Sequence, residues 1–173
     1  MRFEKHQQKY QTTLDDFSAL LFHVPYAKIA YRSLKMVTND QAHGTLFTVL
    51  DAATKYNKKV GNIYTGSLYL SLISLLENGA LMAGKRIGLF SYGSGAVGEF
   101  FSGILQAGYE KYLHQAYHQS LFDNRTELDI KTYETYAVAS LDFNENQSFM
   151  IPEAKGFYLE KIENDMRVYK INQ

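Results

Sequence analysis

The segment Thr65–Asn78 (TGSLYLSLISLLEN) constrains the fold most, because it reads as a helix that is too apolar to lie on a surface. Thr65 can cap its start and Gly79 can stop its end. Its Leu and Ile positions therefore belong to a core or to a dimer face. A buried strand, Lys85–Ser91, follows it closely. A chain that sets a buried helix beside a buried strand requires a layered fold.

The remaining segments predict a mixture of helices and strands. Further helices are expected at 3–10, Ala27–Met36, Ala42–Tyr56, Tyr109–Gln119 and Thr126–Val138, and further strands at Leu14–Phe22, Gly156–Ile162 and Met166–Ile171. Pro25 indicates a turn at His23–Tyr26, and Lys58–Asn62 is expected to be a polar hinge. This alternation predicts an α/β or α+β class. The 173 residues suit one domain or one large half of a bigger one.

Composition excludes several classes of function. The chain has no cysteine, so disulfides, thiolate catalysis and cysteine-bound metals are excluded. Its formal net charge is 0, which makes a nucleic-acid-binding protein a poor prediction. The polar start lacks the apolar region of a secretory signal, and no apolar stretch is long enough for a transmembrane helix. The simplest expectation is a cytoplasmic protein.

The glycine-rich stretch Ser91–Gly103 contains Gly93-Ser-Gly95-Ala-Val-Gly98, a G-x-G-x-x-G pattern that follows an apolar strand. Dinucleotide-binding proteins have such a loop, but they also need a helix that opens at the loop and an acidic residue about 20 positions later. Here the residues after Gly98 fit a helix or a strand equally well, and YEKYLHQAYHQ follows downstream. The pattern therefore leaves a nucleotide site, a tight turn or another ligand loop open.

Three stretches combine polar groups with turns that follow apolar segments: FHVPYAK (Phe22–Lys28), GNIYTGS (Gly61–Ser67) and LFSYGSG (Leu89–Gly95). His23 follows a strand and Asn62 precedes a helix. Ser94 lies between two glycines, where little side-chain bulk shields its backbone. A histidine and an asparagine held at such ends can both address one carbonyl oxygen. The pattern is typical of an oxyanion site for thioester chemistry.

At these motifs the chain resembles 3-hydroxy-3-methylglutaryl-CoA synthases (HMG-CoA synthases), specifically their C-terminal half and the bacterial type. The resemblance runs over nearly the whole chain and is tightest between Val60 and Leu113. It implies an α/β fold class: residues 1–173 would be the C-terminal half of a thiolase-like fold, with a layered mixed sheet and helices. It also implies a condensation of acetyl-CoA with acetoacetyl-CoA in the mevalonate route.

The resemblance assigns roles to four residues. His23 would be the catalytic histidine that contacts the acetoacetyl carbonyl and acts as an acid. Asn62 would hydrogen-bond the acetoacetyl group, Ser94 would line the same pocket, and Lys28 would lie near the CoA phosphates. The glycine loop would then approach a thioester, and its match to the nucleotide pattern would be accidental. The resemblance implies a homodimer, and it implies no cofactor and no metal.

The chain departs from the family in lacking the cysteine nucleophile that carries the acetyl group and the glutamate that acts as general base. Both belong to the family's N-terminal half, so we expect this chain to be inactive until that half is supplied. Two alternatives stay open. One is a non-catalytic thiolase-fold partner or scaffold subunit, and the other is a different thiolase-fold condensing enzyme such as a ketoacyl synthase.

The other polar candidates have simpler interpretations. His114 and His118 are four residues apart and could hold a metal, but a solvated helix face is the favoured interpretation. His6 and His43 are expected on the surface. Glu99 is expected to be structural or exposed. The basic pair at 58–59 suits either a solvated turn or a contact with CoA phosphates.

Overall fold

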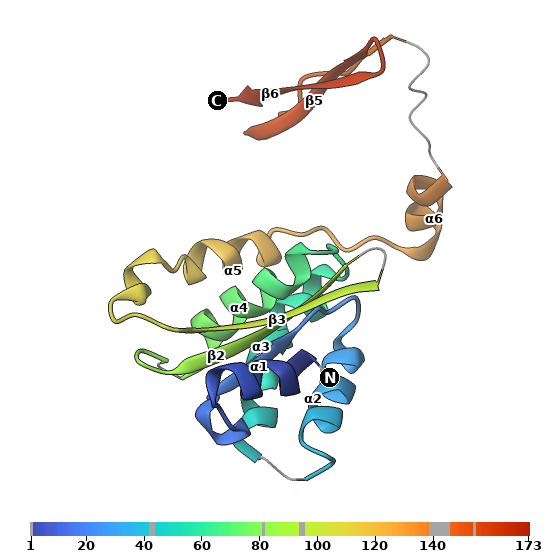
Figure 1. The fold of residues 1–173 in the computed structure, drawn as a ribbon. Coiled ribbons are helices and arrows are strands. Elements are labelled where there is room, and N and C mark those ends of the chain that lie inside the picture. Colours follow the sequence, from blue (N-terminus) through green and yellow to red (C-terminus); the bar gives the residue numbers. More distant parts are fainter. Residues whose placement is uncertain (1, 42–43, 81, 94–95, 139–145, 154) are drawn as a thin grey trace. The chain divides into compact units, whose positions relative to one another are not determined.

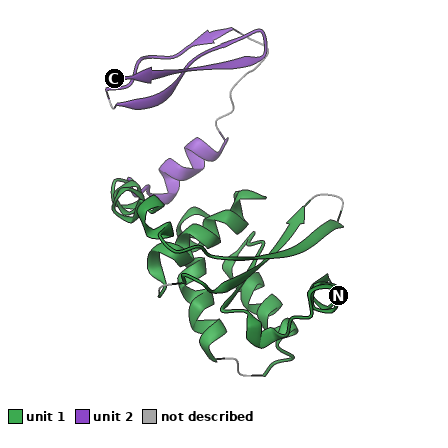
Figure 2. Cartoon of the chain, turned by 60° about the vertical axis from the view of Figure 1, so that its left-hand side comes forward, with its two compact units in different colours: residues 1–125 green, residues 126–173 purple. Residues whose placement is uncertain are grey.

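The computed structural model describes residues 2–41, 44–80, 82–93, 96–138, 146–153 and 155–173. These residues form two compact units, residues 1–125 and 126–173, which Figure 2 shows in different colours. No helix among the described residues is long and apolar enough to cross a bilayer.

Unit 1 contains helices and one sheet, and unit 2 contains a helix followed by the second sheet (Figure 1). In chain order the elements of unit 1 are α1 (Arg2–Tyr10), η1 (Leu14–Asp16), β1 (Ala19–Phe22), α2 (Ala27–Val37), α3 (Gly44–Val60), α4 (Gly66–Asn78), β2 (Arg86–Gly93), β3 (Val97–Ile104), η3 (Tyr109–Tyr112) and α5 (Gln115–Asp123). Unit 2 contains α6 (Ile130–Val138), β4 (Gln147–Ser148), β5 (Gly156–Glu163) and β6 (Met166–Asn172).

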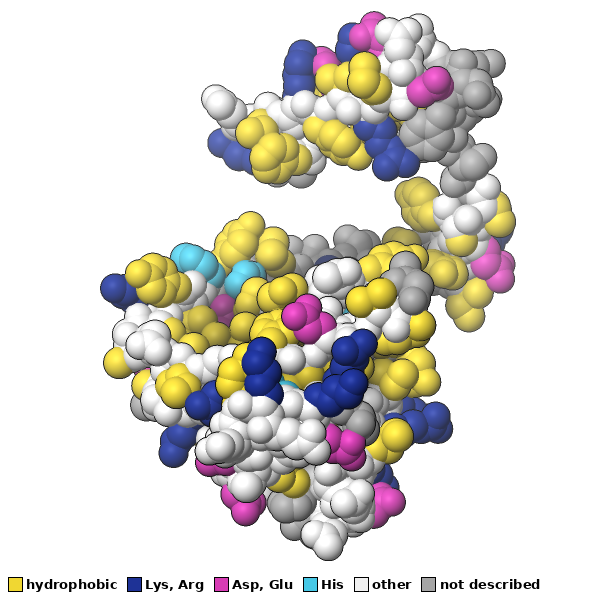
Figure 3. Space-filling model, viewed as in Figure 1, with side chains coloured by type: hydrophobic (Ala, Val, Ile, Leu, Met, Phe, Trp, Pro, Cys, Tyr) yellow, Lys and Arg dark blue, Asp and Glu magenta, His cyan; other side chains and the backbone are white. Residues whose placement is uncertain are grey.

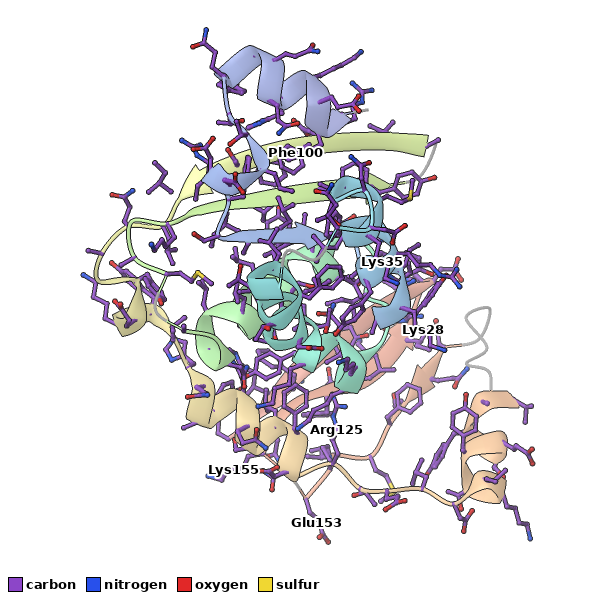
Figure 4. All side chains as sticks on the ribbon, turned by 90° about the horizontal axis from the view of Figure 1, so that it is seen from below. Lys28, Lys35, Phe100, Arg125, Glu153 and Lys155 are labelled. Atoms are coloured by element: carbon purple, nitrogen blue, oxygen red, sulfur yellow. The ribbon has the colours of Figure 1, made fainter. Side chains whose placement is uncertain are left out.

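The sheet of unit 1 has the order β1-β2-β3. β1 and β2 are parallel, with Phe22 opposite Phe90, whereas β3 returns antiparallel to β2. All four residues of β1 are buried, as expected for a strand that helices cover. Figure 4 shows the strands lying between α1 on one side and α3 and α4 on the other.

The helix α4 confirms the prediction of a buried helix and explains how it packs. Ser67, Ser71 and Ser74 form its buried polar stripe, and Leu68 and Leu75 are also buried. Two of the serine hydroxyls donate to α3: Ser71 Oγ to Asn57 Oδ1 at 2.9 Å and Ser74 Oγ to the Ala52 carbonyl at 2.6 Å. Small side chains with internal hydrogen bonds allow the two helices to lie close together without unpaired polar atoms.

The sheet of unit 2 is a β5–β6 hairpin with the short strand β4 beside β5. Its turn is Asn164-Asp165, and both residues have positive φ, 50° and 60°. Two such residues between paired strands make the turn whose twist suits a hairpin. Ile162 is buried, and the strands expected at Gly156–Ile162 and Met166–Ile171 are confirmed, as an antiparallel pair.

The structure decides one alternative that the sequence left open and corrects three expectations about elements. The segment after the glycine loop is the strand β3, so the loop closes a hairpin and opens no helix, which excludes the dinucleotide fold. Lys58–Val60 continue α3, and the chain turns only at Gly61, where φ is 81°. The helix expected at Tyr109–Gln119 is divided into η3 and α5. The strand expected from Leu14 begins only at Ala19, after the helical turn η1.

Candidate functional site

The topology brings three of the four predicted site residues, His23, Lys28 and Asn62, to one edge of the sheet. His23 directly follows β1, and β2 runs parallel to β1. Lys28 lies in the first turn of α2, which begins just after β1. Parallel strands end at the same edge, and in such sheets ligands bind outside the carboxyl ends of the strands.

Asn62 reaches this edge through α4. The chain passes by a short link from the end of α4 to the start of β2, so α4 runs back against the sheet. Its 13 residues span about 20 Å, and the 8 residues of β2 span about 26 Å. The start of α4, with Asn62 before it, therefore lies toward the edge where β1 and β2 end.

The backbone fixes His23 firmly. Its N–H donates to the Phe90 carbonyl at 2.9 Å, which continues the β1–β2 ladder by one residue. Its ring is half-buried and lies 6.2 Å from the ring of Tyr92, centroid to centroid. Tyr92 is 46% exposed at the end of β2. Sequence reasoning missed Tyr92, although its place in SYGSG, two residues before Ser94, was the available signal.

Asn62 shapes the turn that precedes α4. Its Oδ1 accepts a hydrogen bond from the Tyr64 N–H at 2.8 Å, and Tyr64 has a φ of 52°. The Ile63 N–H donates to Ser67 Oγ at 3.1 Å. Behind the turn, Asn57 Nδ2 donates to the Ser67 carbonyl at 3.0 Å. The Asn62 side chain is exposed, and its amide nitrogen has no partner among the described residues.

Of the two remaining predicted site residues, the structure describes only Lys28. Lys28 is exposed on α2 (Figure 4). Ser94 lies outside the described residues. Beside it, Ala96 has a φ of 57°, a value that marks a tight turn. Glu99 is exposed on β3, in agreement with the favoured expectation.

Hydrogen-bond donors dominate this edge. An imidazole, a carboxamide and an ammonium group can polarise a carbonyl oxygen and attract phosphates. None of these candidates is a thiol or a carboxylate, so the set lacks the cysteine nucleophile and the glutamate base that the family resemblance requires. The described residues contain no cluster of three or more side chains suited to a metal.

A buried polar network elsewhere in unit 1 escaped the sequence analysis. Glu77, at the end of α4, accepts hydrogen bonds from Tyr56 Oη at 2.6 Å and from the His114 N–H at 3.0 Å. His118 Nδ1 lies 2.9 Å from its carboxylate. Gln115 Nε2 also donates to the Glu77 carbonyl at 2.6 Å. These contacts attach α5 to α3 and α4.

The network shifts the acidity of its members. Burial would raise the pKa of Glu77, but hydrogen bonds from Tyr56, His118 and the His114 backbone outweigh it and hold the pKa below its usual value. Burial raises the pKa of Tyr56, and its bond to Glu77 raises it further. The expectation of a solvated His118 is therefore wrong, because its ring pairs with a carboxylate that the sequence places 41 residues away.

The expectation for His6 is also wrong. Its side chain is buried among the rings of Phe17 and Phe100, and Ser102 Oγ lies 3.2 Å from its Nε2. The polar neighbours of His6 in the sequence face solvent on the other sides of α1, which concealed its inward position. His43 lies outside the described residues. Of the basic pair at 58–59, Lys58 lies 3.8 Å from the Asp51 carboxylate and Lys59 lies over the Phe122 ring.

Comparison with known proteins agrees with this architecture. Residues 48–170 match the family model described as hydroxymethylglutaryl-coenzyme A synthase C terminal. The HMG-CoA synthase of Enterococcus faecalis is 42% identical over 172 residues, which cover 97% of this chain and 44% of that protein. A 3-hydroxy-3-methylglutaryl-ACP synthase of polyketide biosynthesis in Bacillus subtilis is 34% identical over 62% of this chain and 29% of its own length.

Solved structures give the same result. An HMG-CoA synthase crystallised with CoA superposes with a TM-score of 0.82 at 38% identity, over 98% of this chain and 45% of that one. A Streptococcus mutans protein superposes with a TM-score of 0.86 at 34% identity, over 99% of this chain and 48% of that one. This chain thus spans a little under half the length of these relatives.

The mixed sheet, its flanking helices and these neighbours define a thiolase-like fold. Within that class, the family match over 48–170 and the identity to the Enterococcus faecalis enzyme are specific. The chain belongs to the hydroxymethylglutaryl-CoA synthase family, and it corresponds to the C-terminal part of that family's enzymes.

Proposed function

We propose that this chain provides the acetoacetyl-CoA-binding part of an HMG-CoA synthase. Joined to a segment that carries the cysteine nucleophile and the glutamate base, it would condense acetyl-CoA with acetoacetyl-CoA to HMG-CoA. The observation that carries the proposal is the 42% identity to the Enterococcus faecalis synthase over 97% of this chain.

The site residues have the roles that the family resemblance implies. His23 would contact the acetoacetyl carbonyl and donate a proton to the oxygen as the new carbon–carbon bond forms. Asn62 would donate a hydrogen bond to the same acyl group through its free amide nitrogen, and Ser94 would line the pocket. The rigid backbone of His23, bonded to Phe90, and the structured turn at Asn62 support this proposal.

Lys28 would bind the CoA phosphates. Lys28 lies in the first turn of α2, at the edge where β1 ends, and its side chain is exposed to solvent. Phosphate is a favourable partner for an exposed lysine near a helix start. A CoA thioester is preferred to an acyl-carrier-protein thioester, because the Enterococcus faecalis enzyme covers more of the chain at higher identity than the Bacillus subtilis ACP enzyme.

The wider setting follows from the resemblance. Residues 1–173 would act as one C-terminal portion, completed by the N-terminal half of the enzyme. The assembly would be a homodimer in the cytoplasm and would serve the mevalonate route to isoprenoids. The absence of cysteine from the chain supports the need for that second segment.

Complementation tests the proposal. The chain is mixed with the N-terminal part of the Enterococcus faecalis relative, and release of CoA from acetyl-CoA plus acetoacetyl-CoA is followed with a thiol-reactive dye. We expect turnover in the mixture and none with either part. Association of the parts without turnover would favour a non-catalytic scaffold, and turnover only with acyl-carrier-protein thioesters would favour the polyketide class.

A further inference from the structure

A cavity of about 430 Å³ lies between α1 and β3, away from the residues discussed as the condensation site. Its lining is mainly basic and aromatic on the α1 side and includes the middle of β3. The lining includes Arg2, Lys5, His6, Lys9, Arg86 and Ser102. Neither His23 nor Lys28 lines it.

The charged side chains around this cavity are mostly positive. Arg2, Lys5 and Lys9 follow one face of α1 at helical spacing. In the described part of the chain, none of these three forms an ion pair with a carboxylate. Glu99 is the acidic residue in the lining. Figure 3 shows Lys and Arg side chains gathered over α1 and β3, although the whole chain has a formal charge of 0.

Arg86 contributes from the first position of β2. Its guanidinium donates to Ser102 Oγ at 3.1 Å. Asp16 lies close enough for Arg86 to lower the pKa of its carboxyl group, after the larger effect of hydrogen bonds from Thr13. The Asp16 carboxylate accepts a hydrogen bond from the Thr13 N–H at 2.7 Å. Asp16 does not line the cavity.

His6 presents a buried ring nitrogen, Nδ1, that has no hydrogen-bond partner among the described residues. Arginine is only a donor, so Ser102 Oγ accepts from Arg86. The hydroxyl proton can then point to His6 Nε2, 3.2 Å away. A neutral ring that accepts at Nε2 carries its proton on Nδ1, and Nδ1 is buried with no partner in the described structure. Buried polar atoms of this kind are rare, so each one needs an explanation.

The environment favours the neutral form of this ring. Burial lowers the pKa of His6, and the charges of Arg86 and Lys9 lower it further. The same positive field that disfavours a charged imidazole favours an anion. An anionic oxygen would accept from Nδ1–H and pair with the surrounding ammonium and guanidinium groups.

We propose that the cavity between α1 and β3 binds the phosphate or diphosphate group of a small molecule, through Lys5, Lys9, Arg2 and the buried His6 donor. This site is separate from the CoA-phosphate role given to Lys28, which lies on α2. The inference rests on the side chains around the cavity and does not depend on the proposed synthase activity.

Titration calorimetry with inorganic pyrophosphate, at a constant ionic strength of about 0.1 M, tests the proposal on the 173-residue chain. We expect saturable binding of one anion per chain, and weaker binding of inorganic phosphate. Nitrogen-15 spectra of the imidazole rings provide a second measurement. The His6 ring signals should move with the same binding curve, because the new acceptor faces its Nδ1–H.

Variants that replace a lysine by a neutral glutamine make the test specific. The double variant Lys5→Gln/Lys9→Gln should weaken pyrophosphate binding by about tenfold or more, since charge-assisted contacts are lost. The matched double variant Lys35→Gln/Lys111→Gln removes two exposed charges outside the cavity and should bind as the unmodified chain does. All of these side chains are exposed, so thermal melting should show that both variants fold.

Three results would overturn the proposal: no saturable binding, equal weakening in the two double variants, or binding without any movement of the His6 signals. None of these measurements needs an N-terminal half. Failure of the anion site would therefore leave the complementation assay unaffected, and failure of complementation would leave the anion site intact.

Discussion

Gly88, in the middle of β2, lies where three side chains leave no room for a Cβ atom. A Cβ there would be 2.6 Å from Phe100 Cζ and 2.7 Å from Leu20 Cδ2. Phe100 is itself held between the rings of Phe3 and His6. Gly88→Ala should therefore destabilise the fold by about 1–3 kcal/mol in urea unfolding.

The matched control for this substitution is Gly103→Ala on β3, where a Cβ would meet nothing within 4 Å. It should change the free energy of unfolding by less than about 0.5 kcal/mol. Equal effects of the two substitutions would show that the close contact at Gly88 does not limit the packing of α1 on the sheet.

Glu77 should make stability depend on pH. Its pKa is lower in the folded protein than the reference value of 4.5, so its contribution is fully present above that value. The contribution is lost as the pH falls through the lower, folded pKa. Glu77→Gln should cost about 1–3 kcal/mol near neutral pH and should lose less stability than the unmodified chain on acidification. Urea unfolding at about pH 7 and about pH 3 measures both effects.

Glu110→Gln is the comparison for Glu77, since Glu110 is exposed on η3. It should leave both unfolding free energies within about 0.5 kcal/mol of the original. An identical loss of stability on acidification in the Glu77→Gln variant and in the unmodified chain would contradict the role of the buried network.

At the residue scale, sequence reasoning found groups that lie next to turn signals and missed groups that meet across the fold. His23 and Asn62 could be selected because Pro25 and Gly61 mark the turns beside them. The pairing of Glu77 with His118 joins residues far apart in the chain, and no local pattern encodes it. The burial of His6 likewise depends on Phe100, which the sequence places on a distant strand.

At the scale of elements, α2 provides an internal comparison for the proposed CoA contact. Lys28 lies in its first turn and Lys35 in its last turn, and both are exposed (Figure 4). In the complemented enzyme, Lys28→Ala should raise the KM for acetoacetyl-CoA several-fold with little change in kcat, since a phosphate contact contributes equally before and during reaction.

Lys35→Ala should leave both kinetic constants unchanged, because Lys35 lies at the opposite end of the helix. Steady-state kinetics with varied acetoacetyl-CoA distinguish the two variants. A fall in kcat at constant KM for Lys28→Ala would assign the lysine to the reaction step and remove it from binding CoA.

The β5–β6 turn is a second element that a single substitution can test. Asp165 has a φ of 60°, a conformation that glycine adopts without the steric cost of a side chain. Asp165→Gly should stabilise the hairpin by about 0.5–1 kcal/mol, measured from hydrogen exchange of the β5 and β6 amides. Glu163→Gly, at a strand position, should destabilise it instead. Destabilisation by both would contradict the observed turn.

Elements with strong periodicity or clear turn residues were predictable, and those decided by packing were not. Helix α4 and the terminal hairpin follow from their patterns of apolar residues. The segment around Gly98 fitted a helix by the spacing of its apolar residues between Phe100 and Leu105, and a strand by its alternation between Val97 and Ser102. Pairing with β2 decides it: Phe100 and Phe101 take opposite faces of the sheet, and each face is covered by helices.

At the scale of the whole molecule, the chain contains the donor groups that we propose to bind a thioester, and it contains no cysteine. The sheet edge carries His23 and the turn at Asn62, and the sequence has no cysteine. The length ratio agrees with this division, since the chain covers 44% of the Enterococcus faecalis synthase. We therefore expect the two half-reactions of the enzyme to depend on different polypeptide segments.

The most direct measurement compares the two half-reactions in the complemented enzyme with His23→Ala. Transfer of labelled acetyl from acetyl-CoA to the cysteine is measured separately from condensation with acetoacetyl-CoA. We expect acetyl transfer to survive and condensation to fall by about 10²–10⁴-fold. An equal loss of both half-reactions, or unchanged condensation, would contradict the claim that this chain acts on the second substrate.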